Sequence, residues 1–186
     1  DNMLTRWFAI EYAILFARLL PGLERAGIPI PLGGTSNHLS RARLQQLGEW
    51  DPYNVTEDAD LGIRLASHGY RTAMLDSLTL EEAPARLGPW LRQRSRWIKG
   101  YMQTWLVHMR APGALYRNGG ALGFAGFQLF VGCSSLAYMS APFVWLFAMI
   151  AWALPGPMSM FALPDWFAGF CLFNLALHLI AHWQQA

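Results

Sequence analysis

Residues 121–154 form a long stretch without a charged side chain, and this stretch limits what the chain can fold into more than any other feature. About 20 apolar residues suffice to cross the hydrocarbon core of a bilayer. The stretch predicts a membrane span, either one tilted helix kinked near Pro142 or a pair of short helices, and the single kinked helix is favoured. Two buried helices of a soluble protein are the alternative.

A second apolar stretch, residues 161–181, follows a turn rich in proline and glycine and predicts another span. Polar groups inside a membrane need partners, so a helix that contains Asn174 and His178 is expected to pack against others. Cys133 and Cys171 both lie in the apolar stretches. They indicate small packing residues, and neither a disulfide nor a metal site.

Charge divides the chain into two parts. All 14 lysines and arginines lie before residue 118, and Asp165 is the one charged side chain beyond it. We therefore expect a polar part over residues 1–117 and a transmembrane part over 118–186. Cations precede the first span and none occupies the loop after it, so the polar part is expected to face the cytoplasm; the nearest of them are Lys99, Arg110 and Arg117.

Residues 4–26 show the apolar periodicity of a helix, interrupted by Glu11, Arg18 and Pro21. This segment is either a third span or a buried or interfacial helix. Two charges near its centre favour the buried or interfacial helix.

The segment "GIPIPLGGTSNH", residues 27–38, predicts a strand that leads to a binding loop. Its two prolines favour extended backbone, and its paired glycines leave room for close approach to the main chain. The next side chains offer hydroxyl and amide groups suited to a hydroxyl-rich ligand. The candidate residues are Gly34, Thr35, Ser36 and Asn37. An ordinary glycine-rich turn is the alternative, and from this segment alone it is favoured.

A helix is predicted to begin at Thr56, which can cap it, and to end at Gly69. Acidic residues fill its first turn, as the helix dipole favours. Residues 70–76 then alternate as a strand does. Strand, helix and strand in sequence predict an α/β domain.

The acidic residues of this turn allow three interpretations. The first is a well-capped helix start, which the segment alone favours. The second makes Asp58 a general base that takes a proton from an attacking hydroxyl. The third pairs Asp58 with Asp60 on a divalent metal, but residues two apart on a helix point in different directions.

Residues 90–108 are compatible with one helix that carries Gln93, Arg96 and Trp97 on one face. A guanidinium can bind a diphosphate and an indole can stack on a sugar. Other cations of this helix, Arg92, Arg94 and Lys99, are expected to serve phospholipid headgroups. A net charge of only +2, with the basic residues gathered in this stretch, argues against nucleic acid as a partner.

The order of these motifs resembles the family 2 inverting glycosyltransferases of the cellulose-synthase and hyaluronan-synthase type. "TED" at 56–58 precedes "QRSRW" at 93–97, which meets the family's Q-x-x-R-W signature, and an apolar region follows. "GGTSNH" at 33–38 looks like the family's acceptor-facing segment. The resemblance implies the C-terminal part of a GT-A type domain, followed by transmembrane helices, in a bacterial inner membrane.

The resemblance also implies a mechanism. Asp58 would deprotonate an acceptor hydroxyl, which attacks the anomeric carbon of a nucleotide sugar, expected to be a UDP-sugar, with inversion. Arg96 would stabilise the departing diphosphate. Trp97 would stack on the acceptor, a growing polysaccharide, while Gln93 and Glu57 would help to hold the substrates.

The chain departs from the family in one respect, because the nucleotide-binding half with its metal-binding D-x-D is absent. We therefore expect a fragment, inactive by itself, with Mg²⁺ or Mn²⁺ bound by the missing half and no metal on Asp58 or Asp60. Two rival functions stay open: transfer of single sugars to a lipid or protein acceptor, and a non-catalytic membrane scaffold. A partner subunit for polymer export is a further expectation.

Overall fold

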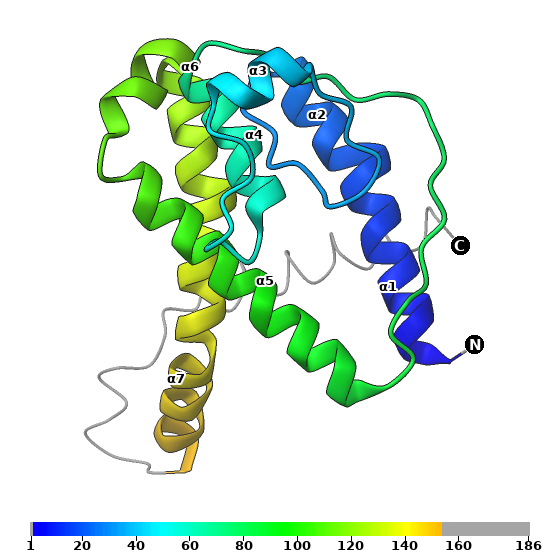
Figure 1. Cartoon of the computed structure of the whole chain (residues 1–186). Coiled ribbons are helices and arrows are strands. Elements are labelled where there is room, and N and C mark those ends of the chain that lie inside the picture. Colours follow the sequence, from blue (N-terminus) through cyan, green and yellow to red (C-terminus); the bar gives the residue numbers. More distant parts are fainter. Residues whose placement is uncertain (1, 154–186) are drawn as a thin grey trace. The chain divides into compact units, whose positions relative to one another are not determined.

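The computed structural model describes residues 2–153, and every regular element in that range is helical. Contacts divide the chain into two units, residues 1–136 and 137–186. In chain order the elements are α1 (Met3–Ile14), the π-helical η1 (Leu15–Leu19), α2 (Leu20–Arg25), α3 (Arg41–Gln46), α4 (Glu57–Ser67), α5 (Leu87–His108), α6 (Pro112–Phe127), the π-helical η2 (Gln128–Cys133) and α7 (Ser134–Ala153) (Figure 1).

The helix predicted over residues 4–26 is present as α1, η1 and α2 in succession. Asn2 begins it with a capping box, because its side-chain oxygen accepts from the backbone N–H of Thr5 at 3.0 Å. Leu20 and Leu23 are buried against Ile30. The segment that follows α2 is thereby packed on the helix that precedes it.

The two strands expected around residues 28–33 and 70–76 are not formed within the described residues. Both segments run without regular structure, so the α/β class predicted from the sequence is not seen in this part of the chain. A strand requires a neighbour to take its backbone hydrogen bonds. Residues 2–153 supply no such neighbour for either segment.

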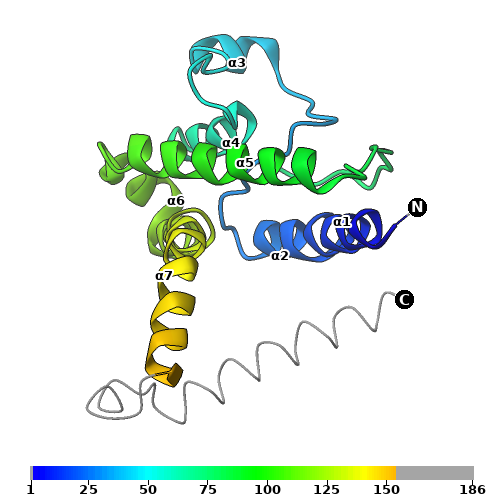
Figure 2. The same ribbon diagram turned by 90° about the horizontal axis from the view of Figure 1, so that it is seen from below.

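Helix α4 lies at the centre of the first unit and packs against both α5 and α6. Viewed from below, α3 and α4 lie on one side of α5, and α1, α2 and α6 lie on the other (Figure 2). Ile63 of α4 forms a buried cluster with Leu115, Phe127 and Val131. This cluster joins α4 to α6 and η2.

Gly62 lets α4 approach the chain that leads out of α2. A Cβ at this position would overlap the carbonyl oxygen of Ile30 and lie 2.9 Å from the backbone nitrogen of Leu32. Both obstacles are backbone atoms, which cannot turn aside as a side chain can. Glycine is therefore required where α4 meets the segment that carries Gly34.

Thr56 occupies the position before α4, but the prediction that its side chain caps the helix is wrong. Its hydroxyl lies 3.4 Å from the side-chain oxygen of Asn54, and its backbone N–H donates to the same oxygen at 3.1 Å. The local bond to Asn54 competes with the cap. The helix still ends as predicted, with Gly69 just beyond it at φ +80°.

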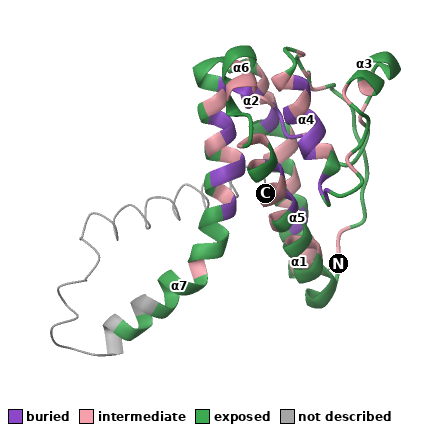
Figure 3. Cartoon of the chain, turned by 60° about the vertical axis from the view of Figure 1, so that its left-hand side comes forward, coloured by how far each residue is buried: buried purple, intermediate pink, exposed green. Residues whose placement is uncertain are grey.

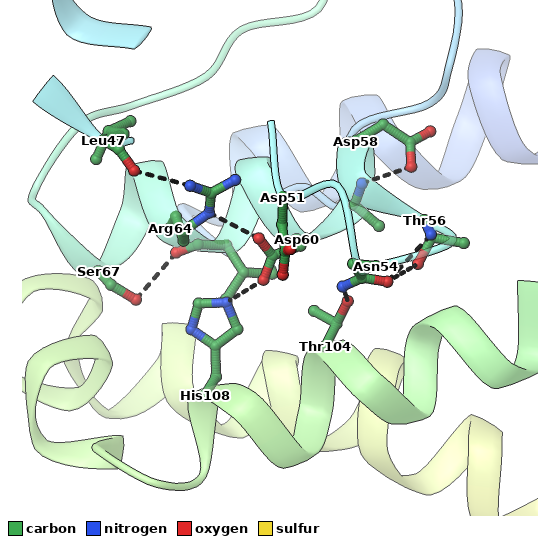
Figure 4. A network of polar contacts seen from close by, with 12 residues as sticks. Leu47, Asp51, Asn54, Thr56, Asp58, Asp60, Arg64, Ser67, Thr104 and His108 are labelled. Carbon is green, nitrogen blue, oxygen red and sulfur yellow. Dashed lines mark hydrogen bonds and ion pairs between the residues drawn. The ribbon is translucent and has the colours of Figure 1, made fainter. Parts of the chain in front are cut away.

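A buried carboxylate joins α4 to α5 (Figure 4). Asp60 is 2% exposed and accepts hydrogen bonds from Arg64 Nε at 2.6 Å and His108 Nε2 at 3.0 Å. Arg64 also donates to the carbonyl of Leu47 at 2.8 Å. Burial would raise the pKa of Asp60, but the bonds and charges of His108 and Arg64 outweigh it and hold that pKa below its ordinary value.

The uncharged stretch is helical as far as it is described. Residues Pro112–Leu146 are long and apolar enough to cross a membrane, with a mean hydropathy of 1.5. Gly120 interrupts the helical geometry at φ 71°, and Pro142 lies inside α7. Large apolar side chains are exposed along α7, among them Phe143 and Trp145 (Figure 3). The second predicted span, at 161–181, lies outside the described residues.

Replacing Gly62 with alanine is expected to destabilise the protein by about 1–3 kcal/mol, because the new methyl group overlaps backbone. Gly22→Ala is the matched control, since a Cβ there meets nothing within 4 Å and the helix gains propensity. The measurement is the thermal unfolding midpoint of the full-length protein in detergent. Equal midpoints for the two variants would contradict the packing described for α4.

Asp60→Asn is expected to cost about 3 kcal/mol at neutral pH, because Arg64 loses its buried counter-charge. The folded-state pKa of Asp60 is depressed, so its contribution is complete above the unfolded value and is lost as pH falls through the folded value. The difference in unfolding midpoint between variant and wild type should therefore shrink in acid. Asp76→Asn, at an exposed site, is the control; a difference that grew in acid would refute this assignment.

Candidate active site

A pocket of about 430 Å³ lies where the N-terminus of α4 meets the loops on either side of α3. Its lining combines three carboxylates and two amides with an indole and a proline ring. The lining residues are Gly34, Asn37, Trp50, Asp51, Pro52, Asn54, Glu57 and Asp58. Polar groups that converge beside an aromatic wall suit a ligand with hydroxyl groups on an apolar ring.

Asp58 stands on the first turn of α4 and is half-buried. Its Oδ1 accepts a hydrogen bond from the backbone N–H of Ala59 at 2.8 Å. Burial raises the pKa of Asp58; the bond from Ala59 opposes that rise and the neighbouring charge of Glu57 adds to it, and the net shift is upward. A half-buried carboxylate with a raised pKa that faces a pocket has the properties of a general base.

Side chains from other parts of the protein lie close to Gly33 and Gly34, the glycine pair of the predicted binding loop. A Cβ on Gly33 would lie 3.0 Å from the Phe16 ring, and a Cβ on Gly34 would lie 3.3 Å from Asp58 Oδ2. Asn37 donates to the carbonyl of Gly33 and lines the pocket. The loop is therefore held between η1 and the carboxylate of Asp58.

Two residues predicted for this loop lie outside the pocket lining. Thr35 and Ser36 are exposed, and Ser36 Oγ is hydrogen-bonded to Thr79 Oγ1 at 2.6 Å. Ser36 adopts φ 54°, which turns the chain at this point. This bond ties the loop to the irregular segment before α5.

Gln93, Arg96 and Trp97 share α5 as predicted, but they do not line the pocket that contains Asp58. Arg96 is exposed, whereas Gln93 and Trp97 are partly buried. In the described part of the chain the buried Oε1 of Gln93 has no hydrogen-bond partner. A buried acceptor of this kind is costly unless a ligand or water donates to it.

Arg94 does not face outward to headgroups, because Glu11 of α1 binds it. The two terminal guanidinium nitrogens of Arg94, Nη1 and Nη2, each donate to one oxygen of the Glu11 carboxylate. The guanidinium also lies 4.6 Å from the ring centre of Trp97 and 5.2 Å from that of Trp90. Arg94 thus joins α1 to α5 and covers one face of the Trp97 indole.

Tyr12 of α1 interacts with members of both groups of candidate residues. Its ring centre is 6.3 Å from that of Trp97. Burial raises the pKa of Tyr12 to about 12; Glu81, Glu11 and Asp58 add to the rise, and Arg94 opposes it. Its hydroxyl is therefore protonated at neutral pH, and its pKa is influenced by the charges of both Asp58 and Arg94.

Across residues 2–153 no three histidine, cysteine or acidic side chains gather closely enough to hold an ion. Asp60 is occupied by Arg64 and His108, so it is not free to share a cation with Asp58. The metal pair considered from the sequence is not supported by this geometry.

Four pocket residues were not predicted from the sequence: Trp50, Asp51, Pro52 and Asn54. All belong to the segment "WDPYN", residues 50–54, which Val55 separates from "TED". A tryptophan and an aspartate next to a proline, a few residues before a candidate base, were the available signal. The tight turn in which Asp51 Oδ1 accepts from the N–H of Tyr53 at 2.9 Å brings them to the pocket.

The chain is similar in sequence to known glycosyltransferases. A probable glycosyltransferase of Bacillus subtilis, YdaM, is 34% identical over 105 residues, which are 53% of this chain and 24% of the relative. The beta-monoglucosyldiacylglycerol synthase of Synechocystis is 32% identical over 81 residues, 42% of this chain and 17% of the relative. The UDP-forming cellulose synthase catalytic subunit of Komagataeibacter sucrofermentans is 29% identical over 139 residues, 72% of this chain and 18% of the relative.

The matched part of the chain therefore spans less than a quarter of the length of these relatives. No solved structure matches. The sequence model of the glycosyl transferase family group 2 matches residues 1–182, which is nearly the whole chain. The chain belongs to glycosyl transferase family group 2.

Proposed function

We propose that the protein containing this chain is a membrane-bound inverting glycosyltransferase that adds sugars from a UDP-sugar to a growing polysaccharide. The observation that carries the proposal is Asp58, a half-buried carboxylate with a raised pKa at the edge of a pocket of sugar-compatible chemistry. The family supports sugar transfer, and one relative is a UDP-forming cellulose synthase subunit. The GT-A type of the complete domain is part of the proposal.

In the proposed reaction Asp58 removes the proton of an acceptor hydroxyl. The acceptor oxygen forms a bond to the anomeric carbon of the donor while the bond from that carbon to the diphosphate oxygen breaks. The nucleotide diphosphate leaves with the electron pair of the broken bond, and its charge is stabilised by Arg96. One displacement of this kind inverts the anomeric centre.

Binding roles follow from chemistry and burial. Glu57, Asn37 and the backbone at Gly34 are proposed to hold acceptor hydroxyls at the pocket. Gln93 offers a buried oxygen that lacks a partner in residues 2–153, which a sugar hydroxyl would satisfy. Trp97 is proposed to stack on the acceptor with the indole face opposite Arg94. Ser36 and Thr35 are proposed to shape this loop from outside the pocket.

The remaining proposals concern the whole protein. Mg²⁺ or Mn²⁺ is proposed to be bound by residues beyond this chain, where it would assist departure of the diphosphate. Residues Pro112–Leu146 support insertion in a membrane, and the cations before them support a cytoplasmic polar part in a bacterial inner membrane. A partner subunit for export is consistent with a polymer product.

A lipid acceptor is the second candidate, favoured by the likeness to a beta-monoglucosyldiacylglycerol synthase. The chemistry at Asp58 would be the same, but one product molecule would carry one added sugar. Mass spectrometry of the product distinguishes a polymer from a single glycolipid.

Asp58→Asn is expected to reduce sugar transfer by about 10²–10⁴-fold, because the amide cannot accept the proton. The measurement is nucleotide release by membranes that contain the full-length protein, across a panel of nucleotide sugars with Mg²⁺ or Mn²⁺. Asp76→Asn, which removes an exposed carboxylate outside the pocket, is the control. Equal turnover by wild type and Asp58→Asn would remove Asp58 as the base.

The acidic limb of kcat/KM is expected above the ordinary range of an aspartate, about pH 4, because activity needs ionised Asp58 and its pKa is raised. Glu57→Gln removes a charge that disfavours this ionisation. The limb should therefore move to lower pH even though the rate falls. A limb that moves upward in Glu57→Gln would show that another group controls it.

A further inference from the structure

One face of α5 carries more than the Q-x-x-R-W residues. Positions 93, 97, 100, 104 and 108 follow one another at intervals of three or four residues, so they form a single strip along the helix. Gln93 and Trp97 occupy the first half of this strip. The second half contacts the residues on either side of Asp58.

The first contact is a buried hydrogen bond before Asp58 (Figure 4). The amide of Asn54 donates to Thr104 Oγ1 at 2.9 Å, and Thr104 is 0% exposed. The side-chain oxygen of Asn54 accepts from the backbone N–H of Thr56 at 3.1 Å. One side chain thus connects α5 to the backbone two residues from Asp58.

The second contact is steric. Gly100 lies one turn before Thr104, and any Cβ at that position would overlap the side chain of Thr56. Thr56 is itself buried. The start of α4 therefore rests directly on the backbone of α5.

The third contact follows Asp58. His108 Nε2 lies 3.0 Å from Asp60 Oδ1, and both side chains are nearly buried. Figure 4 shows Asp60 pointing toward α5 and Asp58 pointing away from it. The chain is fixed to α5 on both sides of Asp58, while the carboxylate of Asp58 is left to face the pocket.

We propose that Thr104, His108 and Gly100 are positioning residues that hold Asp58 at a fixed distance from the substrate-binding end of α5. A helix rises 1.5 Å per residue, so Thr104 lies about 10 Å along the axis from Trp97. The inference rests on the proposed function, in which Asp58 and Trp97 act on the same acceptor. A displacement of about 1 Å between such groups can cost about 100-fold in rate.

The test compares Thr104→Val, which keeps the shape and loses the hydroxyl, with Thr104→Ser, which keeps the hydroxyl. In full-length protein in membranes, Thr104→Val is expected to lower kcat by about 10- to 100-fold with donor KM within about twofold of wild type. Thr104→Ser should restore kcat to within about threefold. Ser95→Ala, an exposed hydroxyl on the opposite face of α5, is the matched control.

Hydrogen exchange of the amides of residues 55–60 gives a readout that does not depend on turnover. It is expected to accelerate by at least tenfold in Thr104→Val and in His108→Ala, and to return toward wild type in His108→Gln. If Thr104→Val does not fold, His108→Ala and His108→Gln are compared instead, because His108 makes the contact that follows Asp58. The two measurements are again kcat and hydrogen exchange.

The outcomes separate the two proposals. Unchanged exchange in both variants would overturn the contact as a constraint on Asp58, and faster exchange with unchanged kcat would overturn its role in the reaction. No turnover by wild type with any donor would overturn the proposed function instead. In that case the exchange measurement still decides whether α5 holds the Asp58 segment.

Discussion

A carboxylate taken out of water must be compensated, and the part of the fold around α4 is organised by that requirement at Asp60. Its two oxygens are satisfied from α4 itself and from the end of α5, by Arg64 and His108. Arg64 also donates to the carbonyl of Leu47, so the same network of hydrogen bonds holds the loop before the pocket. The packing of α4, the course of this loop and the placement of Asp58 all depend on this charge being neutralised in one geometry.

Helices were predictable where periodicity and end signals agreed. The segments 4–26 and 90–108 and the helix after Thr56 are present, because their apolar spacing matches the period of a helix. The two strands were not predictable in this way, because alternation within one segment does not show whether a neighbouring strand exists to pair with it. Pairing is a non-local property, and the described residues lack the partner.

The candidate site was predictable by residue type and less so by contact. Gly34, Asn37, Glu57 and Asp58 come together in one pocket as the motifs suggest. The sequence contained no sign that Glu11, 83 positions away, binds Arg94. It also gave no sign that the side-chain amide of Asn54 donates to Thr104, since such partners are set by how helices cross and not by local pattern.

The guanidinium of Arg94 over one face of Trp97 has a stereochemical consequence. An indole with both faces open would accept a sugar ring in two orientations related by a flip. With one face closed, a ring can stack from one side only, and its own two faces are not equivalent. Under the proposed function, Arg94 would thus fix the side of Trp97 from which the acceptor ring can approach, and so limit how the acceptor chain enters the site.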